Sequence, residues 1–201
     1  MTLPDLPCEI LILAAGASSR MRGTDKLLQP VQGRPLIAHV VQVALATGCP
    51  VSVTLDAARA ARAVALAGLA VRLIPVPDPA AGMTGSLQAG LAALPPAVPV
   101  MVLLGDMPDL TTADLRSLLT FARAEPDLIL RATACDGTPG HPVLFPPWLR
   151  PEIAALPGDT GPRDVLRRHK DRLRLIALPG QHATTDLDTP EDWAAWRART
   201  D

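Results

Sequence analysis

The sequence predicts a single α/β domain of Rossmann-like type, in which helices cover both faces of a mostly parallel sheet. Three observations lead to this prediction. The chain has 201 residues, enough for one domain with a sizeable core. Apolar segments of strand length alternate with segments of helical length and pattern. These apolar segments are continuous, which is typical of strands that are buried on both faces of a parallel sheet.

The elements of the first half follow one another in strand–helix order. The first strand, over 9–15, is apolar and ends at Gly16, and a helix over 36–46 is stopped by Gly48. The other elements of this half are strands at 50–55, 71–76 and 98–106 and helices at about 56–67 and at 84–94. Their alternation favours parallel pairing of the strands.

The second half continues the pattern with more irregular segments. Its clearest helix, over 111–124, has Thr111 or Thr112 as its cap and Asp114 in its first turn. The other elements are strands at 128–134, 141–145 and 172–178 and helices near 163–169 and from 190 onward. The sequence contains no internal repeat and no linker, so residues 1–201 are predicted to form one domain.

The composition excludes several functional classes. The formal net charge is −1, so the chain has neither a basic excess for nucleic acid nor a lysine-rich run for a membrane surface. The uncharged stretches 35–55 and 79–105 contain Pro, Gly and polar residues, which favours buried elements over membrane spans. The three cysteines lack metal-ligand spacing and the N-terminus lacks a secretory pattern, so we expect a cytoplasmic protein.

The segment 11–28, LILAAGASSRMRGTDKLL, runs from an apolar strand into small residues. Consecutive small residues let backbone N–H groups approach an anion closely. Arg20 and Lys26 add full positive charges, and this combination suits a polyphosphate. The P-loop pattern and the dinucleotide-binding pattern are both absent. The alternative is a glycine turn whose cations are simply solvated.

Asp106 follows an apolar strand that Pro108 prevents from continuing. Ligands of open parallel sheets bind beyond the carboxyl ends of the strands, so we expect Asp106 and the loop over 16–26 to face one crevice. We expect the Asp106 carboxylate to be exposed at the sheet edge. It is either a Mg²⁺ ligand, because Mg²⁺ takes one or two carboxylates together with phosphate oxygens, or a turn or cap residue.

The opening loop resembles the pattern L-A-(A or G)-G-x-S-x-R-M-G-x-x-K of the MobA-like nucleotidyltransferases, and most closely that of their molybdenum cofactor cytidylyltransferase branch. Five further segments resemble this family in its own order: GMTGSLQAG at 82–90, LLGDMP at 103–108, GHPVLF at 140–145, GDTGPRDVL at 158–166 and DLDTPEDW at 186–193. The resemblance implies that residues from about 8 to 110 bind the donor nucleotide and that residues 111–201 bind the acceptor.

The residues that the resemblance assigns to the nucleotide are Leu13, Ala14, Ala15, Gly16, Ser18, Ser19, Arg20, Lys26, Gly82, Met83, Ser86 and Asp106. Residues 14–16 would lie against the base and ribose, and the serines and cations would hold the phosphates. Met83 could approach the base, although a packed methionine is the commoner case. In the family LAAG favours cytosine and LAGG guanine, so we expect CTP. Arg22 stands where the family has Gly, so either the loop bends differently or Gly23 makes the turn.

By the same resemblance, Arg20, Lys26 and Asp106 are catalytic, and Asp106 and Asp188 bind Mg²⁺, for which Mn²⁺ could substitute. Asp188 also precedes Thr-Pro, a helix-start signal, so its alternative role is capping. Asp186 is the fallback ligand, because the period-two spacing of a strand would point both carboxylates to one side.

The implied acceptor-binding residues are His141, Asp159, Gly161 and Arg163, with Arg163 as the candidate for the acceptor's phosphate. His141 precedes a proline and is equally explained as a turn residue. The segment around Asp159 and Gly161 is equally explained as a plain Asp-x-Gly turn.

The implied reaction is cytidylyl transfer from CTP to the phosphate of molybdopterin, with release of pyrophosphate. A molybdenum hydroxylase that receives the product is then a transient partner. The alternatives are guanylyl transfer, a sugar or polyol phosphate as acceptor, and a non-catalytic carrier of the finished cofactor. Oxidoreductase activity has been assigned to some relatives of this family, but the dinucleotide-binding pattern is missing here.

Overall fold

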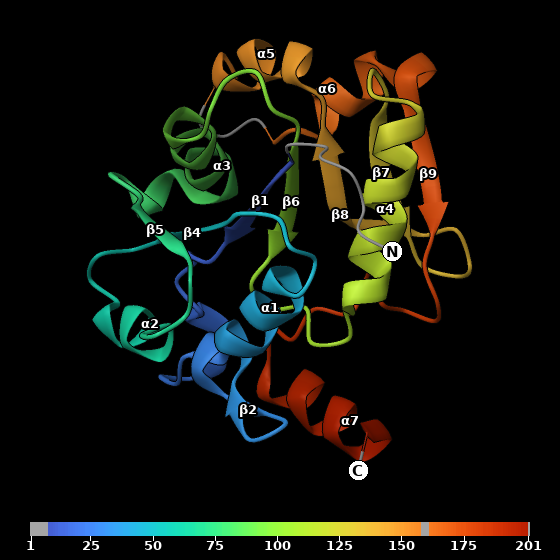
Figure 1. The fold of residues 1–201 in the computed structure, drawn as a ribbon. Coiled ribbons are helices and arrows are strands. Elements are labelled where there is room, and N and C mark those ends of the chain that lie inside the picture. The colour runs from blue at the N-terminus through green and yellow to red at the C-terminus, as the bar shows by residue number, and fades with distance from the viewer. Residues whose placement is uncertain (1–7, 158–160, 201) are drawn as a thin grey trace.

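Seven strands form the central sheet of the computed structural model, which describes residues 8–157 and 161–200. Their order across the sheet is β5-β4-β1-β6-β8-β7-β9 (Figure 1). They are β1 (Glu9–Leu13), β4 (Val51–Leu55), β5 (Arg72–Pro75), β6 (Val100–Leu104), β7 (Ile129–Thr133), β8 (Pro139–Phe145) and β9 (Leu173–Ala177). β8 runs antiparallel to β6 and β7, and the other strands of this sheet run in one direction.

Helices cover both faces of the sheet (Figure 1). On one face lie α1 (Leu36–Leu45), α2 (Ala60–Ala65), α4 (Thr112–Ala124) and α7 (Pro190–Thr200), and on the other α3 (Gly82–Ala93), α5 (Arg150–Ala154) and α6 (Arg163–Arg168). Within β1, Ile10 and Ile12 belong to the first apolar layer and Leu11 to the second, as the period of a strand requires. Burying one such side chain stabilises the fold by about 1.5–3 kcal/mol.

The structure confirms the predicted fold class, and it differs from the element predictions at a few places. β8 is antiparallel because the segment 134–138 between β7 and β8 is too short for the crossover that a parallel pair needs. α2 begins at Ala60 rather than at 56, because Asp56 accepts the N–H of Ala58 in a turn. The hairpin of β2 (Pro30–Val31) and β3 (Arg34–Pro35), and helix α5, were not predicted.

The parallel strands β4, β1 and β6 end at one edge of the sheet. Two hydrogen bonds beyond the strands hold these ends together, from Gly105 N–H to the Leu13 carbonyl at 3.0 Å and from Ala14 N–H to the Thr54 carbonyl at 3.1 Å. The loop after β1 and the residue after β6 therefore meet, as the strand order predicts. None of the helices in the described ranges has the length and apolar character needed to cross a membrane.

Candidate functional site

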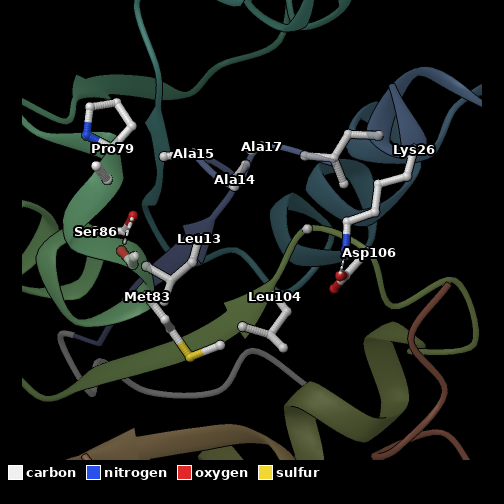
Figure 2. Close-up of a pocket in the computed structure, with 15 residues that line it drawn as sticks. Leu13, Ala14, Ala15, Ala17, Lys26, Pro79, Met83, Ser86, Leu104 and Asp106 are labelled. Atoms are coloured by element: carbon white, nitrogen blue, oxygen red, sulfur yellow. Dashed lines mark hydrogen bonds and ion pairs between the residues drawn. The ribbon is translucent and has the colours of Figure 1, made fainter. Parts of the chain in front are cut away.

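A cavity of about 470 Å³ opens at the carboxyl ends of β1 and β6 (Figure 2). Most of the residues that the sequence assigns to the nucleotide line it: Leu13, Ala14, Ala15, Gly16, Lys26, Gly82, Met83, Ser86 and Asp106. Ser18, Ser19 and Arg20 are not among its lining residues, although they continue the same loop. The structure thus brings residues from four segments of the first half to one crevice.

The loop after β1 presents backbone N–H groups that have no acceptor. Within the described chain, the N–H groups of Ala15, Gly16, Ala17 and Ser18 donate no hydrogen bond to the protein. Ser18 adopts the left-handed conformation, with φ of 52°. Successive N–H groups without partners form a concave site that binds phosphate oxygens. This loop is therefore suited to an anion.

Lys26 joins two aspartates that are distant in sequence. Its ammonium group contacts Asp106 Oδ2 and lies 2.6 Å from Asp188 Oδ1, and Arg20 contacts Asp188 Oδ2. Burial alone would lower the pKa of Lys26, but the charges and hydrogen bonds of the two aspartates outweigh burial and raise it. Lys26 is consequently charged at neutral pH. Figure 2 shows Lys26 and Asp106 pointing toward each other at one end of the cavity.

Asp106 is buried, with an exposed fraction of 8%, so the expectation of an exposed carboxylate is wrong. The segment before α7 covers it, since Leu187 N–H donates to the Asp106 carbonyl at 3.3 Å. The Oδ1 atom of Asp106 is buried and accepts no hydrogen bond from the described residues. A buried polar atom without a partner is costly, and a ligand or cation would satisfy it.

Asp188 and Asp186 lie in an irregular segment rather than in a strand, so the argument from strand spacing is wrong. Asp188 is not the cap of α7 either, because Thr189 and Asp192 cap one another at 2.8 and 3.1 Å. Partial burial and the charges of Asp106 and Asp188 raise the pKa of Asp186. Across the described ranges, no three or more His, Cys, Asp or Glu residues gather as metal ligands. Asp106 and Asp188 are the two carboxylates that contact Lys26.

Arg22, where the family pattern has Gly, itself adopts the left-handed conformation that favours glycine, with φ of 50°. Gly23 follows with φ of 94°, so both residues take part in the turn. The Arg22 side chain forms an ion pair of 2.6 Å with Glu191 at the start of α7. The loop thus keeps its turn in spite of the substitution.

A second cavity, of about 330 Å³, adjoins the first, and Leu13 and Met83 line both. It contains the predicted acceptor residues His141, Gly161 and Arg163. Asp159, the other predicted acceptor residue, lies outside the described residues. The second cavity also contains Arg131 of β7, which sequence reasoning missed because a strand arginine has no local signal.

His141 belongs to strand β8, so its explanation as a turn residue is wrong. Burial and the nearby charges of Arg131 and Arg163 lower the pKa of His141 to about 4. The imidazole is therefore neutral at physiological pH. The second cavity thus presents two cations beside one neutral hydrogen-bonding group, which suits an anionic ligand.

Sequence reasoning also missed a buried cluster behind the loop. Arg62 of α2 contacts Asp25, Ser18 and the Ala14 carbonyl, and Arg59 donates to the Ala17 carbonyl. A usable signal exists, because these two arginines stand in the otherwise apolar segment AARAARAVALA at 57–67. Arginine on the buried side of such a helix needs a partner elsewhere in the fold.

A doubly covered, mostly parallel sheet that carries a loop of unpartnered N–H groups, a lysine and two aspartates at its carboxyl edge is suited to binding a nucleotide. The family follows from comparison with known proteins. Residues 10–173 match the MobA-like NTP transferase domain, and the chain belongs to this family.

Individual relatives support this placement. The chain is 32% identical over 194 residues to nicotine blue oxidoreductase of Paenarthrobacter nicotinovorans, covering 93% of this chain and 95% of that protein. It is 29% identical to the solved structure of Rv0371c from Mycobacterium tuberculosis, with a TM-score of 0.82 and coverage of 94% and 97% of the two chains. Rv0371c has also been solved in complex with manganese. CMP:2-keto-3-deoxy-manno-octonic acid synthetase complexed with CTP shares the fold, with a TM-score of 0.75, 18% identity and coverage of 96% and 98%.

Proposed function

We propose that the protein transfers the cytidylyl group of CTP to the phosphate of a molybdopterin-type acceptor and releases pyrophosphate. The observation that carries the proposal is the pair of adjoining cavities. The first is lined by residues 15–17 with their free N–H groups, by Lys26 and by Asp106, and this lining suits a triphosphate. The second holds Arg131 and Arg163, which suit an anionic acceptor. Membership of an NTP transferase family supports the same class of reaction.

CTP is the proposed donor. The N–H groups of residues 15–18 would bind its phosphates, and Arg20 and Lys26 would neutralise their charge. The Ser18 hydroxyl already bonds to Asp25 and Arg62. We therefore propose that Ser18 contacts the phosphates through its backbone N–H and not through its side chain. The methyl group of Ala15, in the first cavity, leaves less room for a purine base than glycine would, which favours cytosine.

Asp106 and Asp188 are the proposed ligands of a divalent cation. The partnerless Asp106 Oδ1 and the two carboxylates around Lys26 fit Mg²⁺ or Mn²⁺, both of which prefer oxygen ligands. Such a cation, when bound, neutralises charge on the phosphates. The manganese complex of Rv0371c supports a divalent cation for a protein of this kind.

The reaction needs no nucleophilic side chain, because the acceptor's phosphate monoester is itself the nucleophile. One of its oxygens bonds to the α-phosphorus of CTP, the bond from that phosphorus to the bridging oxygen breaks, and pyrophosphate leaves with the electron pair. Arg20 and Lys26 stabilise the negative charge on the transferring phosphates. Arg163 and Arg131 hold the acceptor's anionic group, and neutral His141 hydrogen-bonds to it. Asp159 and Gly161 are proposed to complete the acceptor loop.

Calorimetric titration of the purified protein with CTP, GTP, ATP and NADPH, with and without Mg²⁺, tests the donor. We expect CTP-selective, Mg²⁺-dependent binding that weakens in Lys26→Ala. Tighter binding of GTP would overturn the choice of CTP and favour guanylyl transfer. Binding of NADPH but of no nucleoside triphosphate would contradict nucleotidyl transfer. It would favour an oxidoreductase, as in the name of the relative nicotine blue oxidoreductase.

Pyrophosphate release with a panel of acceptors tests the second substrate. We expect release with molybdopterin and none with sugar or polyol phosphates. In Arg163→Gln the KM for the acceptor should rise while the affinity for CTP stays unchanged. Release with a sugar or polyol phosphate would replace the proposed acceptor. CTP binding without release from any acceptor would favour a non-catalytic carrier.

A further inference from the structure

Arg62 of α2 is fully buried, with an exposed fraction of 0%. A buried charge is costly unless it is paired and hydrogen-bonded. Arg62 meets this requirement through acceptors of the segment 14–25. Its Nε and Nη2 donate to the two oxygens of Asp25 at 2.7 and 2.9 Å. Burial would raise the pKa of Asp25, but Arg62 outweighs it and holds that pKa below its usual range, so the ion pair persists at neutral pH.

Arg62 also fixes the direction of one peptide group in the loop. Its Nη1 donates to the Ala14 carbonyl at 2.6 Å. In a trans peptide the N–H of the next residue points opposite to the carbonyl, so the Ala15 N–H points away from Arg62. Ala14 and Ala15 line the first cavity and Arg62 does not. The guanidinium therefore acts from behind the loop.

Arg62 further holds Ser18 in its unusual backbone conformation. Its Nη2 donates to Ser18 Oγ at 3.0 Å, and Ser18 Oγ donates to Asp25 Oδ1 at 3.2 Å. The left-handed conformation costs about 1–2 kcal/mol for a residue other than glycine, and it persists where the surroundings fix it. One side chain thus fixes both ends of the run of free N–H groups, 15–18.

We propose that Arg62 is a positioning residue, which holds the loop over 14–18 in the conformation that binds the triphosphate. The inference rests on the nucleotidyl transfer proposed above. Lysine cannot replace Arg62, because an ammonium lacks the planar fork that reaches Asp25, Ser18 and the Ala14 carbonyl at once.

The test compares Arg62→Lys with the wild type in two measurements. The first is calorimetric binding of CTP with Mg²⁺, for which we expect affinity to fall about tenfold or more. The second is backbone hydrogen exchange over 14–20, which we expect to become faster. If Arg62→Lys unfolds, the double variant Arg62→Met with Asp25→Leu replaces the buried pair by apolar groups. Both measurements can then be made on a folded protein that lacks the guanidinium.

Arg150→Lys is the matched control, since Arg150 is also buried (8% exposed) and donates to the carbonyls of Leu91 and Leu94, away from the loop. It should lose stability with less than about a twofold change in CTP affinity. Wild-type CTP affinity and wild-type exchange in Arg62→Lys would overturn the inference, as would an equal loss of affinity in Arg150→Lys. If the wild type binds no nucleoside triphosphate, the proposed function fails, and the exchange measurement alone still decides whether Arg62 holds the loop.

Discussion

The cations of the loop each have an acidic partner, and these partners come from Asp106 and the segment 188–191. The pairs differ in energy because they differ in exposure. Arg22 and Glu191 are largely exposed, and such a pair contributes about 0–1 kcal/mol. Lys26 and Asp106 are largely buried, so removing Lys26 leaves the Asp106 carboxylate without its partner, which costs about 3–5 kcal/mol. The Lys26 bridge therefore dominates the electrostatics of the site.

Lys26→Met should strengthen the binding of Mn²⁺ alone by about tenfold, or about 1.4 kcal/mol, and weaken that of CTP. The reason is that Asp106 and Asp188 then repel each other without a cation between them. Electron paramagnetic resonance measures free Mn²⁺ in the titration without nucleotide. Lys170→Met removes an exposed lysine and is the control. Unchanged or weaker binding of Mn²⁺ to Lys26→Met would contradict the expectation.

Asp106→Ala should reduce pyrophosphate release by at least about 10²–10³-fold, the usual effect of losing one group that stabilises the transition state. The far-ultraviolet circular dichroism spectrum should stay that of the wild type, because Asp106 lies beyond the end of β6 and belongs to neither apolar layer. The measurement is steady-state release at saturating CTP and Mg²⁺. Near-normal turnover would remove Asp106 from the mechanism.

Arg22→Gly should leave the protein at least about 0.5 kcal/mol more stable than Arg22→Ala. Both variants lose the ion pair with Glu191, so the difference between them isolates the backbone strain at φ of 50°. Urea denaturation measures the free energy of unfolding of both. Equal stability of the two variants would show that the left-handed conformation of residue 22 stores no strain.

The long helices and the buried strands were predictable from the sequence, because each contains enough apolar residues to show its hydrophobic periodicity. The hairpin β2–β3 escaped prediction because each strand has two residues. Its turn depends on positive φ at Gln32 and Gly33, and glutamine rarely occupies such a position. The antiparallel direction of β8 was not predicted, because it depends on the length of the loop before β8 and not on the hydrophobic pattern.

Part of the candidate site was also predictable at this scale. The meeting of Asp106 with the loop follows from strand order alone, because parallel strands end at one edge. The burial of Asp106 does not follow, since it depends on a segment about eighty residues later in the chain. The place of Arg62 in an apolar segment indicates that it needs a partner, but it does not indicate that the partners lie at residues 14–25. Arg131 donates to the Gly140 carbonyl, and nothing local in the sequence marks that contact.

His141 of strand β8 makes the stability of the fold depend on pH. The pKa of His141 is about 4 in the folded chain and about 6.5 when unfolded, so below pH 6.5 the unfolded chain takes up the proton first. Stability should therefore fall as the pH drops from 6.5 to 4, by about 2–3 kcal/mol at pH 4.5. Urea denaturation at pH 7.5 and 4.5 measures this, and His141→Gln should lose that part of the pH dependence. An identical pH dependence in both proteins would contradict it.

A late segment of the chain completes the candidate site that begins at residue 13. After β9 the chain passes against β8, where His141 N–H donates to the Ala183 carbonyl at 2.9 Å. It then reaches the end of β6, where Asp188 meets Lys26. Gly140 permits this close passage, because a Cβ there would lie 1.8 Å from the Ala183 carbonyl oxygen.

Gly140→Ala should therefore destabilise the fold by about 3 kcal/mol and also weaken Mn²⁺ binding, since the displaced segment carries Asp188. Thermal unfolding and the Mn²⁺ titration measure the two effects. Gly90→Ala is the control, because the atoms nearest to its Cβ would be side-chain atoms of Leu11, far along the chain from Asp188. It should lose stability without losing affinity for Mn²⁺. Unchanged affinity for Mn²⁺ in Gly140→Ala would show that the close contact of Gly140 with Ala183 does not position Asp188.

The pairing of Arg20 and Lys26 with Asp188 and Asp106 has a consequence for the solution conditions in which the protein works. In the proposed complex, a triphosphate would pair with Arg20 and Lys26, and a divalent cation would pair with the two aspartates. One set of ion pairs would then replace another. The number of close opposite charges then changes little. Ordinary anion sites of bare lysines and arginines weaken steeply as ionic strength rises, because dissolved ions screen their unpaired charges. Binding here should therefore vary only slightly with ionic strength.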